Sequence, residues 1–123
     1  MSYACIVLIA SGDNIGRAFV KCFNEIRKSK VHGVFTFIVT NDGIRKVIPQ
    51  LRPIILNNIS HGVSIYLVNH NEFNRLVSEI NVLFKQSVIT SFYIYSDDIN
   101  NGYVRKLIDL AERIGLKYKV VTK

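Results

Sequence analysis

Two adjacent acids, Asp97 and Asp98, follow a run of apolar and aromatic residues in the stretch FYIYSDDINNGYVRK. Acids in this position can cap a helix, orient a ligand hydroxyl or hold a divalent cation, because carboxylate oxygens accept hydrogen bonds and coordinate hard metal ions. His70, in the loop NHNE, adds an imidazole that can act as an acid or a base near neutral pH. The candidate catalytic residues are therefore His70, Asp97 and Asp98.

Short apolar runs alternate with amphipathic stretches along the whole chain. After each of the runs ACIVLIA, VFTFIVT, VSIYLV and ITSFYIY, apolar residues recur at helical spacing, and a last run, KYKVVT, closes the chain. Five such runs separated by four helices predict a doubly wound, Rossmann-like, three-layer α/β fold with a mostly parallel sheet. Pro49 and Pro53 predict a break or a kink in the helix over residues 43–59.

Residues 1–123 are expected to form a single domain, because no linker or low-complexity tract divides them. The order of the strands is left open, and the last strand could run antiparallel to the others. The longest apolar run, from Ala4 to Ala10, is far shorter than the roughly 20 residues of a membrane-spanning helix. No signal-peptide pattern is recognisable, so we expect a cytoplasmic protein.

In a parallel sheet of this kind, ligands bind beyond the carboxyl ends of the strands. The loops expected there, SGDN, TNDG, NHNE and SDDINNG, are all small and polar, and each contains an acid. Such residues often only cap helices, and either Asp97 or Asp98 is expected to cap the last one. The candidate ligand-binding residues come from the first and last of these loops and the helical turns that follow, and they are Ser11, Gly12, Asp13, Asn14, Arg17, Ser96, Asn100, Asn101, Gly102 and Arg105.

A basic residue recurs in or near the first turn of each predicted helix, where the helix dipole disfavours positive charge by a few tenths of a kcal/mol. Two partners would explain this pattern: the capping acids, in surface ion pairs worth about 0.5 kcal/mol, or a bound phosphate. The formal charge of +7, from 16 Lys and Arg against 9 Asp and Glu, also favours an anionic partner such as a nucleotide, a nucleic acid or the acidic face of another protein. The cations concerned are Arg17, Arg45, Lys46, Arg75, Arg105 and Lys106.

One resemblance is to small nucleases of the PIN and NYN type. Asp13 follows the first predicted strand, and the stretch YSDDINNGYVRKLIDLAERIG is similar to the acidic turn that these nucleases carry after a late strand. The resemblance implies a Mg²⁺-dependent nuclease in which Asp13, Asp97 and Asp98 hold the metal ion and the basic first turns face the phosphodiester. Mg²⁺ is the cofactor of this alternative alone.

The layout of nearly the whole chain resembles the CRISPR-associated Rossmann fold (CARF) family, in the stretches ACIVLIASGDNIGRAF, VFTFIVTNDGIRKVIPQL, GVSIYLVNHNEFNRLVSEI and FYIYSDDINNGYVRKLIDLAERIGLKYKVV. This resemblance implies a homodimer that binds, or cleaves, cyclic oligoadenylates through residues 11–14 and 96–102. Arg17 and Arg105 would then neutralise phosphate, Asp97 or Asp98 would orient a ribose hydroxyl, and His70 would be tested first for cleavage. A third alternative is an interaction module whose loops only cap helices.

Overall fold

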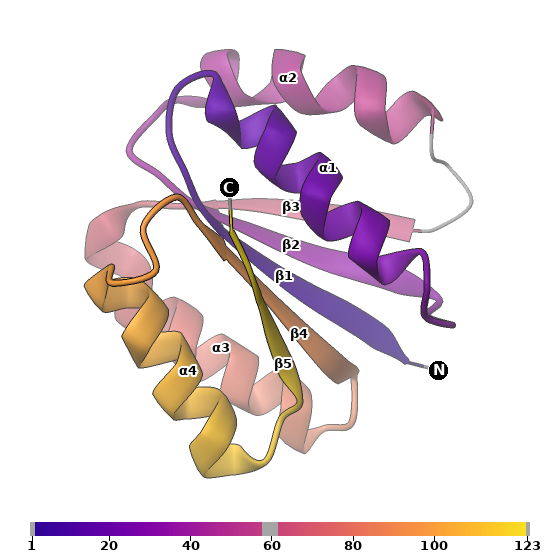
Figure 1. Cartoon of the computed structure of the whole chain (residues 1–123), viewed down its shortest axis with the longest axis vertical. Helices are drawn as coiled ribbons and strands as arrows, with labels where there is room; N and C mark the ends of the chain where they lie inside the picture. Colours follow the sequence, from indigo (N-terminus) through magenta and orange to yellow (C-terminus); the bar gives the residue numbers. More distant parts are fainter. Residues whose placement is uncertain (1, 58–61, 123) are drawn as a thin grey trace.

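The structure is a computed structural model that describes residues 2–57 and 62–122. Within these residues, five strands alternate with four helices (Figure 1), as predicted. The strands are β1 (Tyr3–Ile9), β2 (Gly33–Val39), β3 (Gly62–Val68), β4 (Ile89–Ser96) and β5 (Tyr118–Val121). The helices are α1 (Asn14–Ile26), α2 (Ile44–Asn57), α3 (Phe73–Lys85) and α4 (Gly102–Ile114), with a short 3-10 helix at His70–Glu72.

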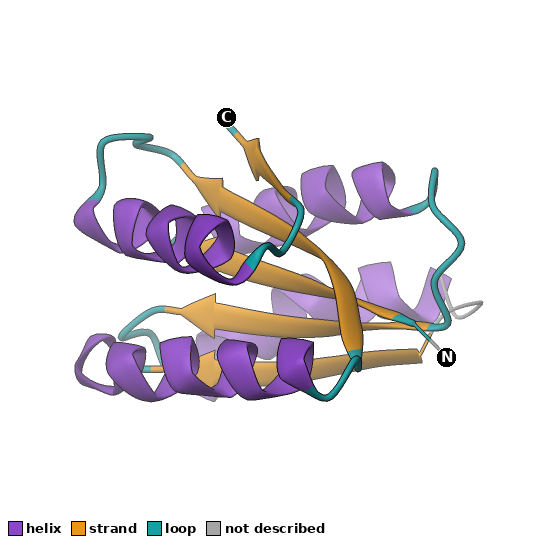
Figure 2. Cartoon of the chain, turned by 90° about the horizontal axis from the view of Figure 1, so that it is seen from below, coloured by secondary structure: helices purple, strands orange, loops and turns teal. Residues whose placement is uncertain are grey.

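All five strands are parallel, and they lie in the order β3-β2-β1-β4-β5. Helices α1 and α2 cover one face of the sheet, and α3 and α4 cover the other (Figures 1 and 2). This arrangement confirms the three-layer, doubly wound fold. The last strand, whose direction was open, is parallel to β4.

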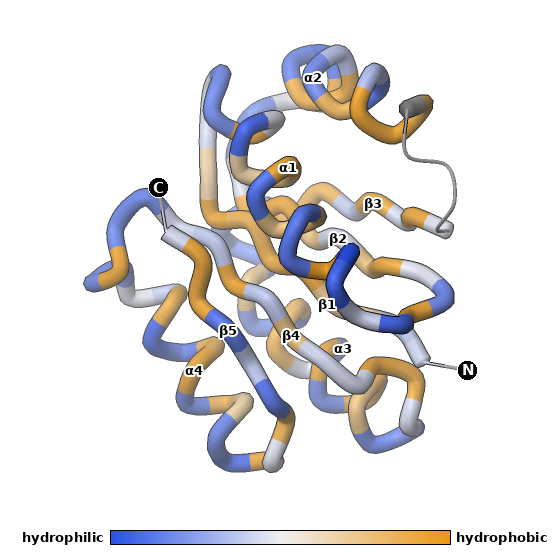
Figure 3. The backbone as a smooth tube through the Cα atoms, turned by 45° about the vertical axis from the view of Figure 1, so that its right-hand side comes forward, coloured by the Kyte–Doolittle hydropathy of each residue, from blue (hydrophilic) through white to orange (hydrophobic). Residues whose placement is uncertain are grey.

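The core consists of two apolar layers, one on each side of the sheet. Successive side chains of a strand point to opposite faces, so Ile6 and Leu8 of β1 pack toward α1 and α2, whereas Cys5 and Val7 pack toward α3 and α4. Each helix contributes one apolar side, and hydrophobic positions recur along its length between hydrophilic ones (Figure 3). Both thiols, those of Cys5 and Cys22, are free and buried.

Helix α2 is not broken at its prolines, so the predicted break is wrong. The helix runs continuously from Ile44 to Asn57 with Pro49 and Pro53 inside it. Both proline rings are exposed, and a proline removes only one N–H donor from the helix. The carbonyls left without that donor belong to Arg45 and Pro49, which are exposed residues whose backbone can bond to water. None of the helices in the described residues is long and apolar enough to span a membrane.

Candidate functional site

A polar cavity lies where the chain reverses its direction of travel across the sheet. From β1 the chain moves outward to β2 and β3, and it then crosses over to β4 on the other side of β1. The loops after β1 and β4 therefore diverge, which leaves a crevice at the carboxyl ends of these neighbouring strands. The cavity there measures about 230 Å³ and is lined by Ile9, Ala10, Ser11, Val39, His70, Ser96, Asp97, Asp98 and Asn101. We call it the switch-point cavity.

The switch-point cavity brings together all three candidate catalytic residues, His70, Asp97 and Asp98. Of the candidate ligand-binding residues, Ser11, Ser96 and Asn101 also line it. The other seven candidates do not line this cavity, and they are Gly12, Asp13, Asn14, Arg17, Asn100, Gly102 and Arg105. The cavity is therefore lined by two carboxylates, an imidazole, two hydroxyls and an amide, without a lysine or an arginine.

Asp97 is oriented by a buried tyrosine on the strand that precedes it. The hydroxyl of Tyr95 donates a hydrogen bond of 2.6 Å to Oδ1 of Asp97. Tyr95 is buried, and burial together with the hydrogen bond to the Asp97 carboxylate raises the pKa of its phenol to about 12. This contact fixes one carboxylate oxygen of Asp97 and leaves the other for a ligand.

The raised pKa of Tyr95 predicts a loss of stability at high pH. The phenol has a higher pKa in the folded protein, about 12, than its ordinary value of 10.0, so its neutral form stabilises the fold fully below pH 10 and loses that effect between pH 10 and about 12. The difference between the phenolate absorbance titrations of the wild type and of Tyr95→Phe should be centred near pH 12. Tyr118, whose pKa is also raised by its hydrogen bond to Glu112, titrates in both proteins and cancels in this difference. A difference between the two curves centred near pH 10 would contradict the assignment.

Asp98 shapes the loop after β4 but does not cap α4. Its Oδ1 accepts from the backbone N–H of Asn100 at 2.9 Å. The Ser96 hydroxyl donates to the Asp98 carbonyl at 3.0 Å and accepts from the Asp98 N–H at 3.2 Å. The residue that caps α4 is Asn101, whose Oδ1 accepts from the N–H of Tyr103 at 2.8 Å. The prediction that Asp97 or Asp98 caps this helix is therefore wrong.

The loop after β1 is held from α2 by Gln50, which the sequence analysis missed. The Gln50 amide nitrogen donates to the carbonyl of Gly12 at 2.8 Å, and its Oε1 accepts from the N–H of Gly16 at 3.0 Å. On the other side, Oδ2 of Asp42 accepts from the N–H of Gly12 at 2.7 Å. The left-handed backbone of Gly12, with φ of +63°, gives the loop its tight turn. The only sequence signal for Gln50 was a polar residue near the apolar side of a helix.

His70 lines the cavity and is held by the loop after β2. Its backbone N–H donates to Oδ1 of Asn41 at 3.3 Å, and its Nδ1 lies 3.4 Å from the Asn41 amide nitrogen. With Asn41 as the donor, Nδ1 is an acceptor, and the proton of a neutral ring is then carried by Nε2. The ring also contacts the ring of Tyr103, with a centroid distance of 5.3 Å. These contacts position His70 while leaving it exposed.

The first-turn cations do not pair with the capping acids. In the described part of the chain the ion pairs are those of Glu25 with Lys28 and with Lys119. Arg17 lies with Asp13 along the groove between α1 and α2, outside the switch-point cavity. The Asp13 side chain makes no capping hydrogen bond to α1. The ion-pair explanation for the repeated cations is therefore wrong for the residues that the structure describes.

The acids of these loops do not assemble a metal site. No group of three or more His, Cys, Asp or Glu side chains among the described residues is placed to hold a metal ion. Asp97 and Asp98 share the switch-point cavity, whereas Asp13 lines the groove between α1 and α2. The three carboxylates that the nuclease alternative requires are thus divided between two surfaces.

The fold and the site define a class: a doubly wound α/β protein with a five-stranded parallel sheet and a polar cavity at its switch point. The chain belongs to the family described as "Family of unknown function (DUF5751)", which matches residues 6–122. A crystal structure of a hypothetical protein from Sulfolobus tokodaii is similar, with 21% sequence identity and a TM-score of 0.76 over 89% of this chain and 85% of that one. That likeness shows the fold alone. No curated protein matches the chain.

Proposed function

We propose that the switch-point cavity binds an anionic, nucleotide-type ligand, with a ribose hydroxyl against Asp97 and Asp98. The observation that carries this proposal is the pair of carboxylates in one cavity at the switch point of the sheet. Each carboxylate has one oxygen fixed by the protein, through Tyr95 or Asn100, and an oxygen left to accept from a ligand hydroxyl. Ser11 and Asn101 add neutral polar groups beside them.

The phosphate of such a ligand would lie outside the cavity, because two carboxylates repel an anion and no cation lines the wall. The N-termini of α1 and α4 flank the diverging loops, and neither first turn contains an acid. Free backbone amides at a helix N-terminus attract phosphate. Arg105 and Lys106 lie exposed in the first turns of α4 and supply positive charge there. A cyclic oligoadenylate, which the CARF resemblance favours, would offer both the hydroxyl and the phosphate.

Calorimetric titration tests this proposal. The ligands are a cyclic oligoadenylate, adenosine monophosphate and a generic RNA, each with and without Mg²⁺. We expect metal-independent binding of at least one adenosine species, weakened about tenfold or more in Asp97→Asn, since a hydrogen bond to a charged group contributes about 1.5–3 kcal/mol. The amide can still accept from Tyr95, so the fold is retained. Asp109→Asn, an equal charge change at an exposed position of α4, is the matched control and should bind like the wild type.

The other outcomes separate the alternatives. RNA cleavage that requires Mg²⁺ and disappears in Asp97→Asn would replace the proposal with the nuclease. Absence of binding to every ligand would leave the interaction module. If a cyclic oligoadenylate is bound and also cleaved, His70→Ala should abolish cleavage while binding stays within a few-fold, because the proposed hydrogen bonds to the ribose hydroxyl come from Asp97 and Asp98 and not from His70.

A further inference from the structure

Two surfaces of this chain are unexplained by the switch-point cavity, and they lie on opposite faces of the sheet beside its edge strand β3. The first is the outer side of α2. Ile44 and Leu56 are 62% and 63% exposed, and Ile48 is 37% exposed. Arg45 and Arg52 are exposed on the same helix, and α2 contains no acid. We call these five residues the basic-apolar face of α2.

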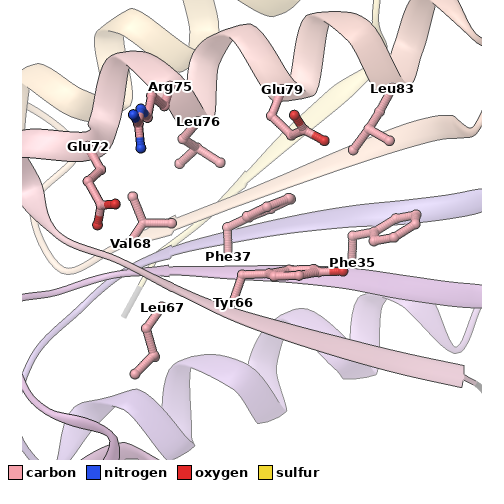
Figure 4. A pocket seen from close by; sticks show the side chains of 10 residues that line it. All are labelled: Phe35, Phe37, Tyr66, Leu67, Val68, Glu72, Arg75, Leu76, Glu79 and Leu83. Carbon is pink, nitrogen blue, oxygen red and sulfur yellow. The ribbon is translucent and has the colours of Figure 1, made fainter.

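The second surface is a groove of about 320 Å³ between α3 and the sheet (Figure 4). Its floor is aromatic and is formed by Phe35, Phe37 and Tyr66, with Tyr66 stacked on Phe37 at a centroid distance of 5.2 Å. Glu72, in the 3-10 turn before α3, and Glu79, in α3, line the helical side of the groove, with Glu79 nearer to Leu83 (Figure 4). We call this surface the α3 groove. It is open because the chain crosses from β3 to β4, which places α3 nearer the middle of the sheet and leaves β3 uncovered on this face.

These two surfaces contain half of the large apolar side chains that are exposed among the described residues. Among the described residues, eight large apolar side chains are more than a third exposed, and four of them belong to the basic-apolar face of α2 or to the α3 groove: Ile44, Ile48, Leu56 and Tyr66. The β3 strand between the two surfaces, GVSIYLV, contains no charge and no proline. Sheet edges that do not pair with another chain usually carry a charged residue or a proline, or are very short. The β5 edge does, with Lys119 in a strand of only four residues.

The charges of the two surfaces are complementary in sign and in spacing. Arg45 and Arg52 are seven residues apart on α2, and Glu72 and Glu79 are seven residues apart along α3 and the turn before it. Seven residues rise about 10.5 Å in a helix. None of these four side chains forms an ion pair within the described part of the chain. Arg75, between the two acids, is the one cation that lines the groove.

We propose that a second copy of this chain occupies the α3 groove with its basic-apolar face of α2, and that the contact is reciprocal. Both helices run opposite to the strands, because each connects the end of one parallel strand to the start of the next. A two-fold axis parallel to the strands, along the β3 edge, keeps these directions and brings α2 of each copy beside α3 of the other. Arg45 then faces Glu72 of the second copy, Arg52 faces its Glu79, and the apolar side chains cover the aromatic floor. Such an interface uses the same patches on both subunits.

This association does not require a ligand at the switch-point cavity, whose two carboxylates follow β4 and not β3. One cavity residue, His70, lies in the same 3-10 turn as Glu72 of the proposed interface. The two-fold axis leaves both cavities open on the same side of the dimer. If no ligand binds in the titration, the proposed interface is therefore not contradicted. If the chain does not dimerise, the proposal for the cavity is not contradicted either.

Charge reversal tests the interface, with the association state measured by analytical ultracentrifugation. We expect the wild type to be a dimer, and Glu79→Arg and Arg52→Glu each to dissociate at least about tenfold more readily, because like charges then face each other twice in every dimer. An equimolar mixture of the two variants should recover a heterodimer, since both contacts in it are again between opposite charges. The double variant should recover a homodimer for the same reason. Asp109→Arg, on the exposed side of α4, is the control and should dimerise like the wild type.

Three results would overturn the proposal: a monomeric wild type, a dimer that survives both single reversals, or two single variants that remain monomeric when mixed. Circular dichroism and thermal melting of every variant establish that each is folded before its association is compared. The mixing experiment does not depend on the stability of one variant, because both partners are measured alone as well. A dimer that survives both reversals would point to direct pairing of the β3 strands.

Discussion

Replacing Phe92 with alanine is expected to lower the free energy of unfolding by about 3–5 kcal/mol, as is usual for the removal of a buried aromatic ring. Phe92 lies in β4 and is 1% exposed, among the apolar side chains that join the sheet to α3 and α4. A domain of this size is stable by only about 5–15 kcal/mol. The variant should therefore unfold at a much lower urea concentration than the wild type. If the wild type is stable by only about 5 kcal/mol, the variant should be partly unfolded even without urea.

Phe84→Ala is the matched control for this measurement. Phe84 is in α3 and packs against the same apolar cluster, but it is only partly buried. The same atoms are removed from a site that water already reaches, so the loss should be clearly smaller. If both variants lose the same free energy of unfolding in urea, the tight packing around Phe92 is contradicted.

The second large effect is expected at Gly33, where β2 begins. A Cβ atom added there would lie 2.7 Å from Cε1 of Tyr3 and 2.9 Å from the carbonyl oxygen of Gly62. The tyrosine ring is itself held against Phe35, at a centroid distance of 5.3 Å, and the carbonyl belongs to the neighbouring strand. Gly33→Ala should therefore push β1 or β3 away from β2 and cost about 1–3 kcal/mol of stability.

Gly43→Ala provides the comparison for Gly33. A Cβ at Gly43 meets nothing within 4 Å, and its backbone is not left-handed. Gly43 is at the N-cap position of α2, since its carbonyl accepts from the N–H groups of Lys46 and Val47. The substitution should change stability by less than about 1 kcal/mol, because alanine restricts the unfolded chain but is less favourable than glycine at an N-cap. Thermal melting of the two variants distinguishes a steric effect at Gly33 from a general effect of losing a glycine. Equal melting temperatures would contradict the close approach of Tyr3.

The periodicity of the sequence was sufficient to predict which segments form strands and helices, because apolar runs rich in β-branched residues and apolar residues at helical spacing are local properties. The strand order β3-β2-β1-β4-β5 was not predictable, since it depends on which edges pack together once the helices are in place. Helix α2 shows the limit of a local rule, because Pro49 and Pro53 fall on its exposed side, where water can donate to the carbonyls that lose their N–H partner. A proline count cannot say on which side of a helix the rings lie.

The site was predictable to the level of its loops but not of its side chains. His70, Asp97 and Asp98 line one cavity, because the loops that contain them lie at the carboxyl ends of the parallel strands, as predicted. Arg17 was expected beside them, yet the direction of a helical side chain follows from the rotation of the helix about its axis. Packing of Ile15, Ala18 and Phe19 into the core sets that rotation and places Arg17 along the groove toward α2. Asn101 caps α4 where an aspartate was expected, because a turn closed by the hydrogen bond from the Asn101 N–H to the Asp98 carbonyl lies between the acids and the helix.

The hydrogen bonds from Gln50 and Asp42 to the glycine turn have a consequence for the thermodynamics of ligand binding. A loop that is already anchored at both its N–H and its carbonyl loses little conformational entropy when a ligand arrives. Calorimetry should therefore report a smaller entropic penalty for the wild type than for Gln50→Ala, whose loop would have to become ordered in the act of binding. On the proposed function, affinity at the cavity would thus be set partly by a residue on another helix that no ligand need touch.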